Sequence, residues 1–200
     1  KKYGEEIACV IVEPYMANCG LILPVSGFLR ELRSITEKYR SILIFDEIMT
    51  GFRIGLGGVQ AEEKILPDLT ALGKIIGGGL PVGALGGKSE IMDFLAPNGP
   101  VYQAGTLSGN PLAVAAGIAS IKKLKKTKPY KKLSFMVSEI KKAITNASKE
   151  KSIPIVFNNA GSMFSIFFTN KEINNFLDAK NSNTNLFNSF FSRALENGLY

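Results

Sequence analysis

SILIFDE at residues 41–47 and LTALGK at residues 69–74 are the two stretches that decide the fold. Each is an apolar run of strand length that ends in charge, with Asp46 and Glu47 closing the first and Lys74 the second. Short apolar runs rich in β-branched residues are typical of strands in the core of a sheet. We therefore expect two buried strands whose ends carry the charged residues of a site rather than of a solvated surface.

The sequence before residue 41 completes a strand–helix–strand pattern. Residues 7–12 are a continuous β-favouring run, which predicts a strand covered on both faces. Residues 28–39 have helical periodicity, with an apolar side made of Phe28, Leu29, Leu32 and Ile35. Because a strand, a helix and a second strand form a βαβ unit, the sequence predicts an α/β fold with a largely parallel sheet.

The remaining elements follow from periodicity and from helix start and stop signals. Asn110-Pro111 begins a long helix, because Asn is a favoured N-cap and Pro loses no hydrogen bond at the first helical position. Helices are expected near 62–65, 90–95, 111–126, 130–149 and 187–196, and strands near 82–85, 153–157 and 162–169, with a turn at 158–161. With Lys128-Pro129 as a hinge, we expect a large domain over residues 1–128 and part of a smaller α+β domain over residues 129–200.

The net charge of +7 comes from one segment, residues 121–151, which holds 11 Lys/Arg and 2 Asp/Glu. Its lysines alternate with apolar residues at helical spacing, a pattern typical of the solvated face of a helix. A nucleic-acid surface is the alternative, but no aromatic-and-basic RNA motif or zinc-finger spacing accompanies the lysines. We therefore expect neither a nucleic-acid nor a membrane partner.

Several classes of site are excluded by what the 200 residues lack. There is no histidine, so Ser-His, Cys-His and His-metal chemistry are ruled out within this sequence. Cys9 and Cys19 offer no disulfide framework and no metal-ligand spacing, so no metal site is expected and a reducing compartment is the simplest interpretation. No apolar run approaches the roughly 18 residues of a membrane span.

Lys74 and Asp46 together suggest a particular chemistry. The apolar neighbours of Lys74 predict a buried side chain, and a desolvated lysine is a free amine able to condense with carbonyls; the alternative is a lysine whose head reaches water. Asp46, at the carboxyl end of a parallel strand, is expected to face the crevice where open α/β sheets bind ligands. A Schiff-base lysine and a carboxylate facing a pyridinium nitrogen are what pyridoxal phosphate requires. For Glu47, a structural hydrogen-bonding role and a functional one both remain open.

Three segments resemble, in order and spacing, the class III pyridoxal-phosphate aminotransferases: DEIMTGFR at 46–53, GKIIGGG at 73–79 and GTLSGNP at 105–111. The resemblance implies a fold-type I, aspartate-aminotransferase-like fold that binds pyridoxal or pyridoxamine phosphate. It implies that Lys74 forms the Schiff base, that Asp46 pairs with the pyridine nitrogen and that Ile48 packs behind the ring. Gly105 and Thr106 would reach the cofactor phosphate of a partner subunit, which implies a homodimer.

Asn18 matches a family residue near the cofactor and substrate, although the preceding residue is Ala17 where many relatives have Gly. Some members of this family move an amino group within one amino-aldehyde substrate, for tetrapyrrole (porphyrin) synthesis in the cytoplasm or the plastid stroma. The sequence is similar to those members at Met49, Phe52 and Arg53 and in the 96–108 pattern. An ω-aminotransferase that passes the amine to a 2-oxo acid, and an inactive homologue or basic interaction module, are the alternatives. The family's phosphate cup, ring-stacking aromatic and gating loop are expected before Lys1 and the end of its small domain after Tyr200, so the chain alone is expected to be inactive.

Overall fold

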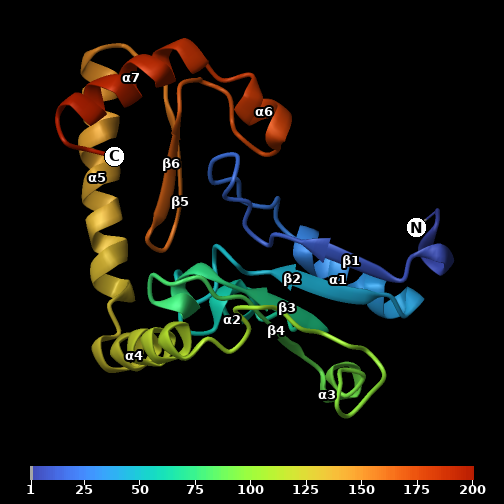
Figure 1. Cartoon of the computed structure of the whole chain (residues 1–200). Helices are drawn as coiled ribbons and strands as arrows, with labels where there is room; N and C mark the ends of the chain where they lie inside the picture. The colour runs from blue at the N-terminus through green and yellow to red at the C-terminus, as the bar shows by residue number, and fades with distance from the viewer. Residues whose placement is uncertain (1) are drawn as a thin grey trace. The chain divides into compact units, whose positions relative to one another are not determined.

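The computed structural model describes residues 2–200, which divide into two compact units (Figure 1). The first unit contains the residues up to Pro14 and Ser26–Pro129, and the second contains Tyr15–Val25 and Tyr130–Tyr200. The sequence predicts a division between residues 128 and 129, one residue before the break at Pro129. It does not predict that Tyr15–Val25 belongs with the C-terminal part.

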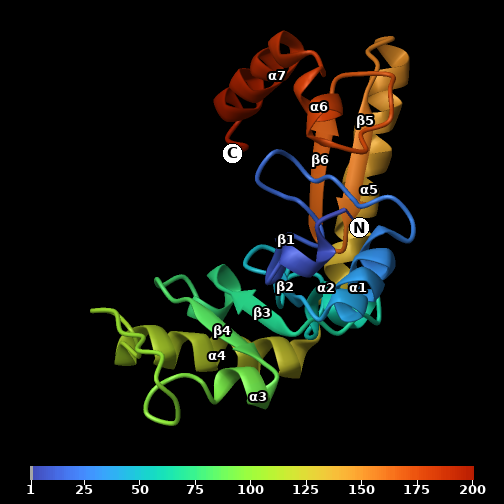
Figure 2. The same cartoon turned by 90° about the vertical axis from the view of Figure 1, so that its right-hand side faces the viewer.

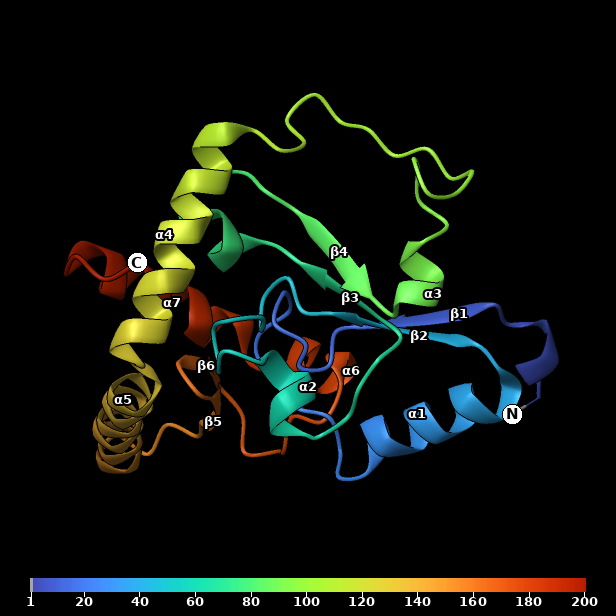
Figure 3. The same ribbon diagram turned by 90° about the horizontal axis from the view of Figure 1, so that it is seen from below.

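A four-stranded sheet forms the centre of the first unit as the structure describes it (Figure 3). Its strands, in spatial order, are β1 (Cys9–Val12), β2 (Ile42–Asp46), β3 (Leu69–Leu72) and β4 (Ala84–Gly87). The β1–β2 and β2–β3 pairs are parallel, whereas β4 runs antiparallel to β3. The predicted α/β class with a largely parallel sheet is therefore confirmed.

Helix α1 (Phe28–Tyr39) connects β1 to β2 and packs alongside β2 (Figure 3), as the βαβ pattern predicts. Leu43 and Phe45 of β2 are fully buried and form the core with Leu29 of α1. The prediction that β1 is covered on both faces is wrong for the described residues, because Ile11 is 62% exposed. An apolar sequence allows a strand to be buried but does not supply the elements that bury it. No part of the described chain covers the face of β1 that carries Ile11.

The short elements of the first unit are η1 (Gly4–Glu6), α2 (Gly58–Glu62), η2 (Lys74–Gly77) and α3 (Ser89–Met92), and its longest helix is α4 (Pro111–Thr127). Asn110 caps α4 as predicted, since its side chain accepts hydrogen bonds from the amides of Leu112 and Ala113. The strand expected near 82–85 lies two residues later, because its bounds follow its partner: Ala84 pairs with Leu72 and Gly87 with Leu69. The helical turn expected near 62–65 likewise begins earlier, at Gly58.

The second unit contains α5 (Tyr130–Glu150), the antiparallel hairpin β5 (Val156–Ala160) and β6 (Met163–Phe167), α6 (Phe176–Lys180) and α7 (Thr184–Glu196) (Figure 2). The predicted turn at 158–161 is wrong, because β5 continues through Ala160 and the chain reverses at Gly161, whose φ is 54°. Asn158 and Asn159 are instead ladder residues. The core of the unit consists of Ile22, Phe167, Ile173 and Ala179.

The basic segment ends α4 and continues along α5, and all of its lysines are exposed. Lys141 also lies over the ring of Phe157, with Nζ 5.8 Å from the ring centre. This exposure agrees with a solvated helix face. Among residues 2–200, no helix combines the length and the apolar character needed to cross a membrane.

Candidate functional site

Asp46 and Lys74 lie at the same edge of the sheet. Asp46 is the last residue of β2 and pairs in register with Ala71 of the parallel strand β3. Lys74 follows two residues after β3 ends and opens η2. The structure thus brings a carboxylate and an amine to the carboxyl ends of adjacent parallel strands, where open α/β sheets bind ligands.

Local hydrogen bonding orients the end of β2. Asp46 is half-buried, and its Oδ1 accepts a hydrogen bond from the amide of Ile48 at 3.1 Å. This bond to the amide two residues on is a typical Asx turn, which redirects the chain after the strand. The side chain of Ile48 then packs on Gly73, where a β-carbon would lie 3.2 Å from Cγ2 of Ile48. Ile48 therefore contacts the backbone directly before Lys74.

The predicted burial of Lys74 is wrong, because the side chain is exposed while Gly73 and Gly77 on either side are buried. The chain turns sharply into η2 after β3, and Lys74 begins this turn with a φ of 47°. A left-handed φ at a residue other than glycine costs on the order of 1–3 kcal/mol and is concentrated at functional sites. The lysine head reaches solvent, which was the alternative that the sequence left open.

Helix α4 holds η2 in place through close backbone packing. The α-carbon of Gly117 lies so near the carbonyl oxygen of Ile76 that no β-carbon would fit between them. Gly78, with a φ of 58°, approaches Ala116 in the same way: a β-carbon on Gly78 would lie only 2.6 Å from the carbonyl oxygen of Ala116. Gly78 and Gly117 therefore permit the close helix–turn packing that fixes the backbone carrying the lysine.

An open cavity of about 1030 Å³ adjoins Lys74. Its lining includes the cationic side chains of Arg53, Lys74 and Lys123, together with the Gly78-Gly79 backbone and α4, and it includes no carboxylate. A concave surface that carries charge of one sign concentrates ligands of the opposite sign. The cavity is therefore suited to an anionic ligand, and the sequence did not predict Arg53 or Lys123 as part of it.

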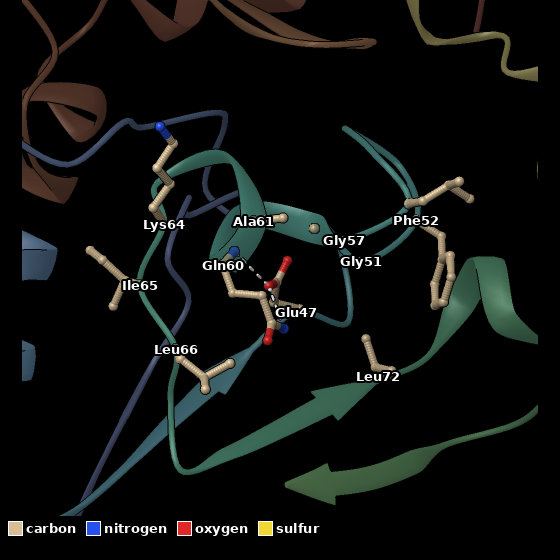
Figure 4. A pocket seen from close by; sticks show the side chains of 12 residues that line it. Glu47, Gly51, Phe52, Gly57, Gln60, Ala61, Lys64, Ile65, Leu66 and Leu72 are labelled. Atoms are coloured by element: carbon tan, nitrogen blue, oxygen red, sulfur yellow. Dashed lines mark hydrogen bonds between the residues drawn. The ribbon is translucent and has the colours of Figure 1, made fainter.

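Glu47, the other charged residue after β2, is fully buried. Its carboxylate accepts hydrogen bonds from the amides of Val59 and Gln60, from Gln60 Nε2 and from Thr50 Oγ1, at 2.7 to 3.1 Å. Figure 4 shows the carboxylate directed at the start of α2, beside a cavity of about 530 Å³. Gly58 lies against the carboxylate and leaves no room for a β-carbon. The geometry assigns Glu47 the structural role: it caps α2 and ties the 50–60 loop to the sheet.

Gly105 and Thr106 lie in an exposed loop before α4. Gly105 lines a separate cavity of about 760 Å³ with residues 81–85, and its carbonyl accepts a hydrogen bond from the amide of Ser108. Thr106 is not among the residues that line the cavity at Lys74. Asn18 belongs to the second unit, in a short loop that precedes Gly20. The roles of Gly105, Thr106 and Asn18 therefore stay predictions.

Comparison with known proteins gives one consistent answer. The family model for class III aminotransferases matches residues 1–200. Over 200 residues, the chain is 52% identical to a glutamate-1-semialdehyde 2,1-aminomutase of Sulfurihydrogenibium sp. (strain YO3AOP1), covering 100% of this chain and 47% of that protein. The chain spans about half the length of the curated relatives it matches.

Solved structures give the same fold. A β-phenylalanine aminotransferase from Variovorax paradoxus superposes with a TM-score of 0.92 at 30% identity, covering 100% of this chain and 46% of that one. A glutamate-1-semialdehyde aminomutase from Pseudomonas aeruginosa PAO1 superposes with a TM-score of 0.78 at 25% identity, covering 90% and 42%.

Proposed function

The chain belongs to the class III aminotransferase family, and on that basis we propose that the whole protein converts glutamate 1-semialdehyde to 5-aminolevulinate. The reaction is an intramolecular amino transfer that depends on pyridoxal or pyridoxamine 5′-phosphate, and its product feeds tetrapyrrole synthesis. The observation that carries the proposal is the placement of Asp46 and Lys74 at the ends of adjacent parallel strands. The 52% identity to a glutamate-1-semialdehyde 2,1-aminomutase supports the choice of substrate.

The residues at this edge fit the cofactor chemically. An exposed primary amine can bond to an aldehyde carbon, and a half-buried carboxylate can accept a hydrogen bond from a protonated ring nitrogen. When bound, the cofactor's pyridine ring supplies an electron sink for the bonds that break at the substrate's amine-bearing carbon. Asp46 would hold the ring nitrogen in its protonated form, and Ile48, anchored on Gly73, would cover the ring from behind.

Lys74 has two tasks in this scheme. Its Nζ would hold the cofactor, and the same amine would take up and return the proton at the substrate's reacting carbon. The rigid turn behind it, packed on α4, would keep Nζ within reach of that carbon.

The remaining residues have roles that depend on a second subunit or on the substrate. Gly105 and Thr106 would hold the cofactor phosphate of the partner subunit, so we propose a homodimer. Asn18 would contact the substrate or cofactor. The 1–128 and 129–200 segments would correspond to half of the large domain and part of the small domain, and the enzyme would act in the cytoplasm, or in the plastid stroma of a eukaryote.

The experiment assays the whole protein for 5-aminolevulinate from glutamate 1-semialdehyde, with no amino acceptor added. The parent protein is expected to turn over, whereas Lys74→Ala is expected to lose both turnover and the visible absorbance of lysine-bound cofactor. Lys125→Ala removes an exposed lysine of α4, away from Lys74 in the sequence, and is the matched control. It should keep both the turnover and the absorbance. A fully active Lys74→Ala protein would refute the mechanism.

A class III ω-aminotransferase is the second candidate, and the TM-score of 0.92 to a β-phenylalanine aminotransferase favours it. Such an enzyme uses the same lysine and aspartate but needs a 2-oxo acid to receive the amine. If amino transfer takes place only after a 2-oxo acid has been added, the protein is therefore this second candidate. If the whole protein fails to bind pyridoxal phosphate at all, an inactive homologue is the correct description.

A further inference from the structure

The segment around Asn18 is a compact closed loop. Met16 and Ile22 exchange two backbone hydrogen bonds, with N···O distances of 3.2 and 2.9 Å, and so close the loop at its base. Inside the loop, Gly20 has a φ of 87° and lies against the ring of Phe167, where a β-carbon would be 2.7 Å from Cζ. The loop is therefore held within the second unit at two places, at its base and at Gly20.

The loop is fastened to the β5–β6 hairpin at Leu21. The amide of Leu21 donates a hydrogen bond to Ser165 Oγ at 2.8 Å, and Asn158 Nδ2 donates one to the carbonyl oxygen of Leu21 at 2.9 Å. Leu21 is only 2% exposed, so both of its backbone groups need partners within the protein. Side chains of the hairpin provide what a neighbouring strand would otherwise supply.

Asn158 and Ser165 form one unit because they are register partners in the β5–β6 ladder. Residues directly opposite each other in an antiparallel pair point to the same face. One contributes a donor and the other an acceptor, matched to the carbonyl and the amide of a single residue. Asn is disfavoured in strands, so strand propensity does not account for its position in the middle of β5.

We propose that Asn158 and Ser165 are positioning residues for Asn18: the two side chains fix the Met16–Ile22 loop to the β5–β6 hairpin. Asn18 is thereby oriented by the second unit, although it follows β1 of the first unit by only six residues. This inference rests on the proposed function for the role of Asn18 in binding substrate. Ile22 remains packed on Phe167, Ile173 and Ala179 without the clamp, so loss of the hydrogen bonds shifts the loop and leaves the unit folded.

The test uses the whole protein with its cofactor and compares Ser165→Ala, Asn158→Leu and Asn18→Ala. Loss of one hydrogen bond of ordinary strength is expected to raise KM for glutamate 1-semialdehyde about 5- to 10-fold, with kcat and cofactor absorbance retained. Ser165→Thr keeps the hydroxyl and should restore the parent KM. Asn159→Ala is the matched control, because it changes the adjacent β5 residue, whose side chain bonds to Lys141 instead of Leu21.

A double-mutant cycle separates positioning from general stability. In the Asn18→Ala background, Ser165→Ala is expected to cause no further rise in KM, because both substitutions remove the same substrate contact. Independent, multiplicative effects of the two substitutions on KM would overturn the proposal. So would an unchanged KM in both Ser165→Ala and Asn158→Leu.

Hydrogen exchange provides a readout that is independent of activity. The Leu21 amide is expected to exchange at least tenfold faster in Ser165→Ala than in the parent protein, while amides of β6 keep their rates. If the parent protein forms no 5-aminolevulinate, the proposed function fails and the clamp is judged by this measurement. An unchanged Leu21 exchange rate in Ser165→Ala overturns it.

Discussion

Ile48 and Gly73 are in direct contact, and through this contact the two strand ends of the candidate site support each other. A β-carbon on Gly73 would lie 3.2 Å from Cγ2 and 3.6 Å from Cγ1 of Ile48. The amide of Ile48 is bonded to Asp46, and Gly73 directly precedes Lys74. The positions of the carboxylate and of the amine are thus coupled by one packed side chain.

Gly73→Ala is expected to destabilise the chain by about 1 kcal/mol, as modest overpacking does. The φ of −162° at Gly73 suits any residue, so the cost comes from Ile48, which has to move by a few tenths of an ångström. Urea unfolding of the variant measures the loss. Gly86→Ala, at a strand position where nothing lies within 4 Å of a β-carbon, is the control and should be near neutral. If the two variants unfold at the same urea concentration, the Ile48 contact is too loose to couple the site.

Glu47→Gln is expected to lower the free energy of unfolding by about 2–3 kcal/mol. The buried carboxylate accepts only, whereas an amide would turn an NH₂ group toward backbone amides or toward Thr50 and leave a donor unpaired. Chemical denaturation, followed by circular dichroism, measures the effect. Glu62→Gln, an exposed residue of α2, is the matched control and is expected to change stability by less than about 0.5 kcal/mol.

Much of the fold could be predicted from local sequence signals. Helix α1 matches its predicted bounds, α4 begins at the predicted Asn110 cap, and the placement of Asp46 and Lys74 at neighbouring strand ends follows from parallel topology. In each case, the periodicity or capping signal and the tertiary structure favour the same answer.

The features that the sequence did not predict depend on contacts between distant residues. The clamp on Leu21 joins residues 137 and 144 positions away, so no local pattern marks Tyr15–Val25 as part of the second unit. Asn158 is in a strand because Ser165 pairs with it, against its own turn preference. Lys74 is exposed because the backbone turns at Gly73, while its apolar neighbours suggested burial.

Acid is expected to weaken the first unit through Asp68. Burial alone would raise the pKa of this carboxyl, but hydrogen bonds from Lys88, the Leu43 amide and Arg33, with the charge of Arg33, outweigh burial and lower its pKa below 3.8. Because the folded pKa is the lower one, this stabilisation is complete above about pH 4 and is lost as the pH falls through the folded value.

Asp68→Asn isolates this contribution. At neutral pH the variant is expected to be about 2 kcal/mol less stable than the parent chain, since the charged acceptor of these bonds is lost. Below pH 4 the difference in stability should shrink, because Asp68 of the parent chain then becomes protonated and loses its charge. Unfolding midpoints between pH 2.5 and pH 7 measure the two curves, and parallel curves would exclude Asp68 as the group responsible. Asp93→Asn, at an exposed carboxylate, is the control.

Gly117→Ala is expected to detach η2 from α4, although alanine improves helix propensity by about 1 kcal/mol. The new methyl group would occupy the position of the Ile76 carbonyl oxygen, which is backbone and cannot move unless the Lys74–Gly77 turn moves with it. We therefore expect a net loss of about 2 kcal/mol in stability, in the range of core overpacking. In the whole protein, the displaced turn should also weaken cofactor retention. Ala115→Gly, at an exposed position of the same helix, provides the comparison: it should cost about 1 kcal/mol from propensity and leave cofactor retention unchanged. A Gly117→Ala protein that is more stable than its parent would show that the α4–η2 contact does not fix the lysine.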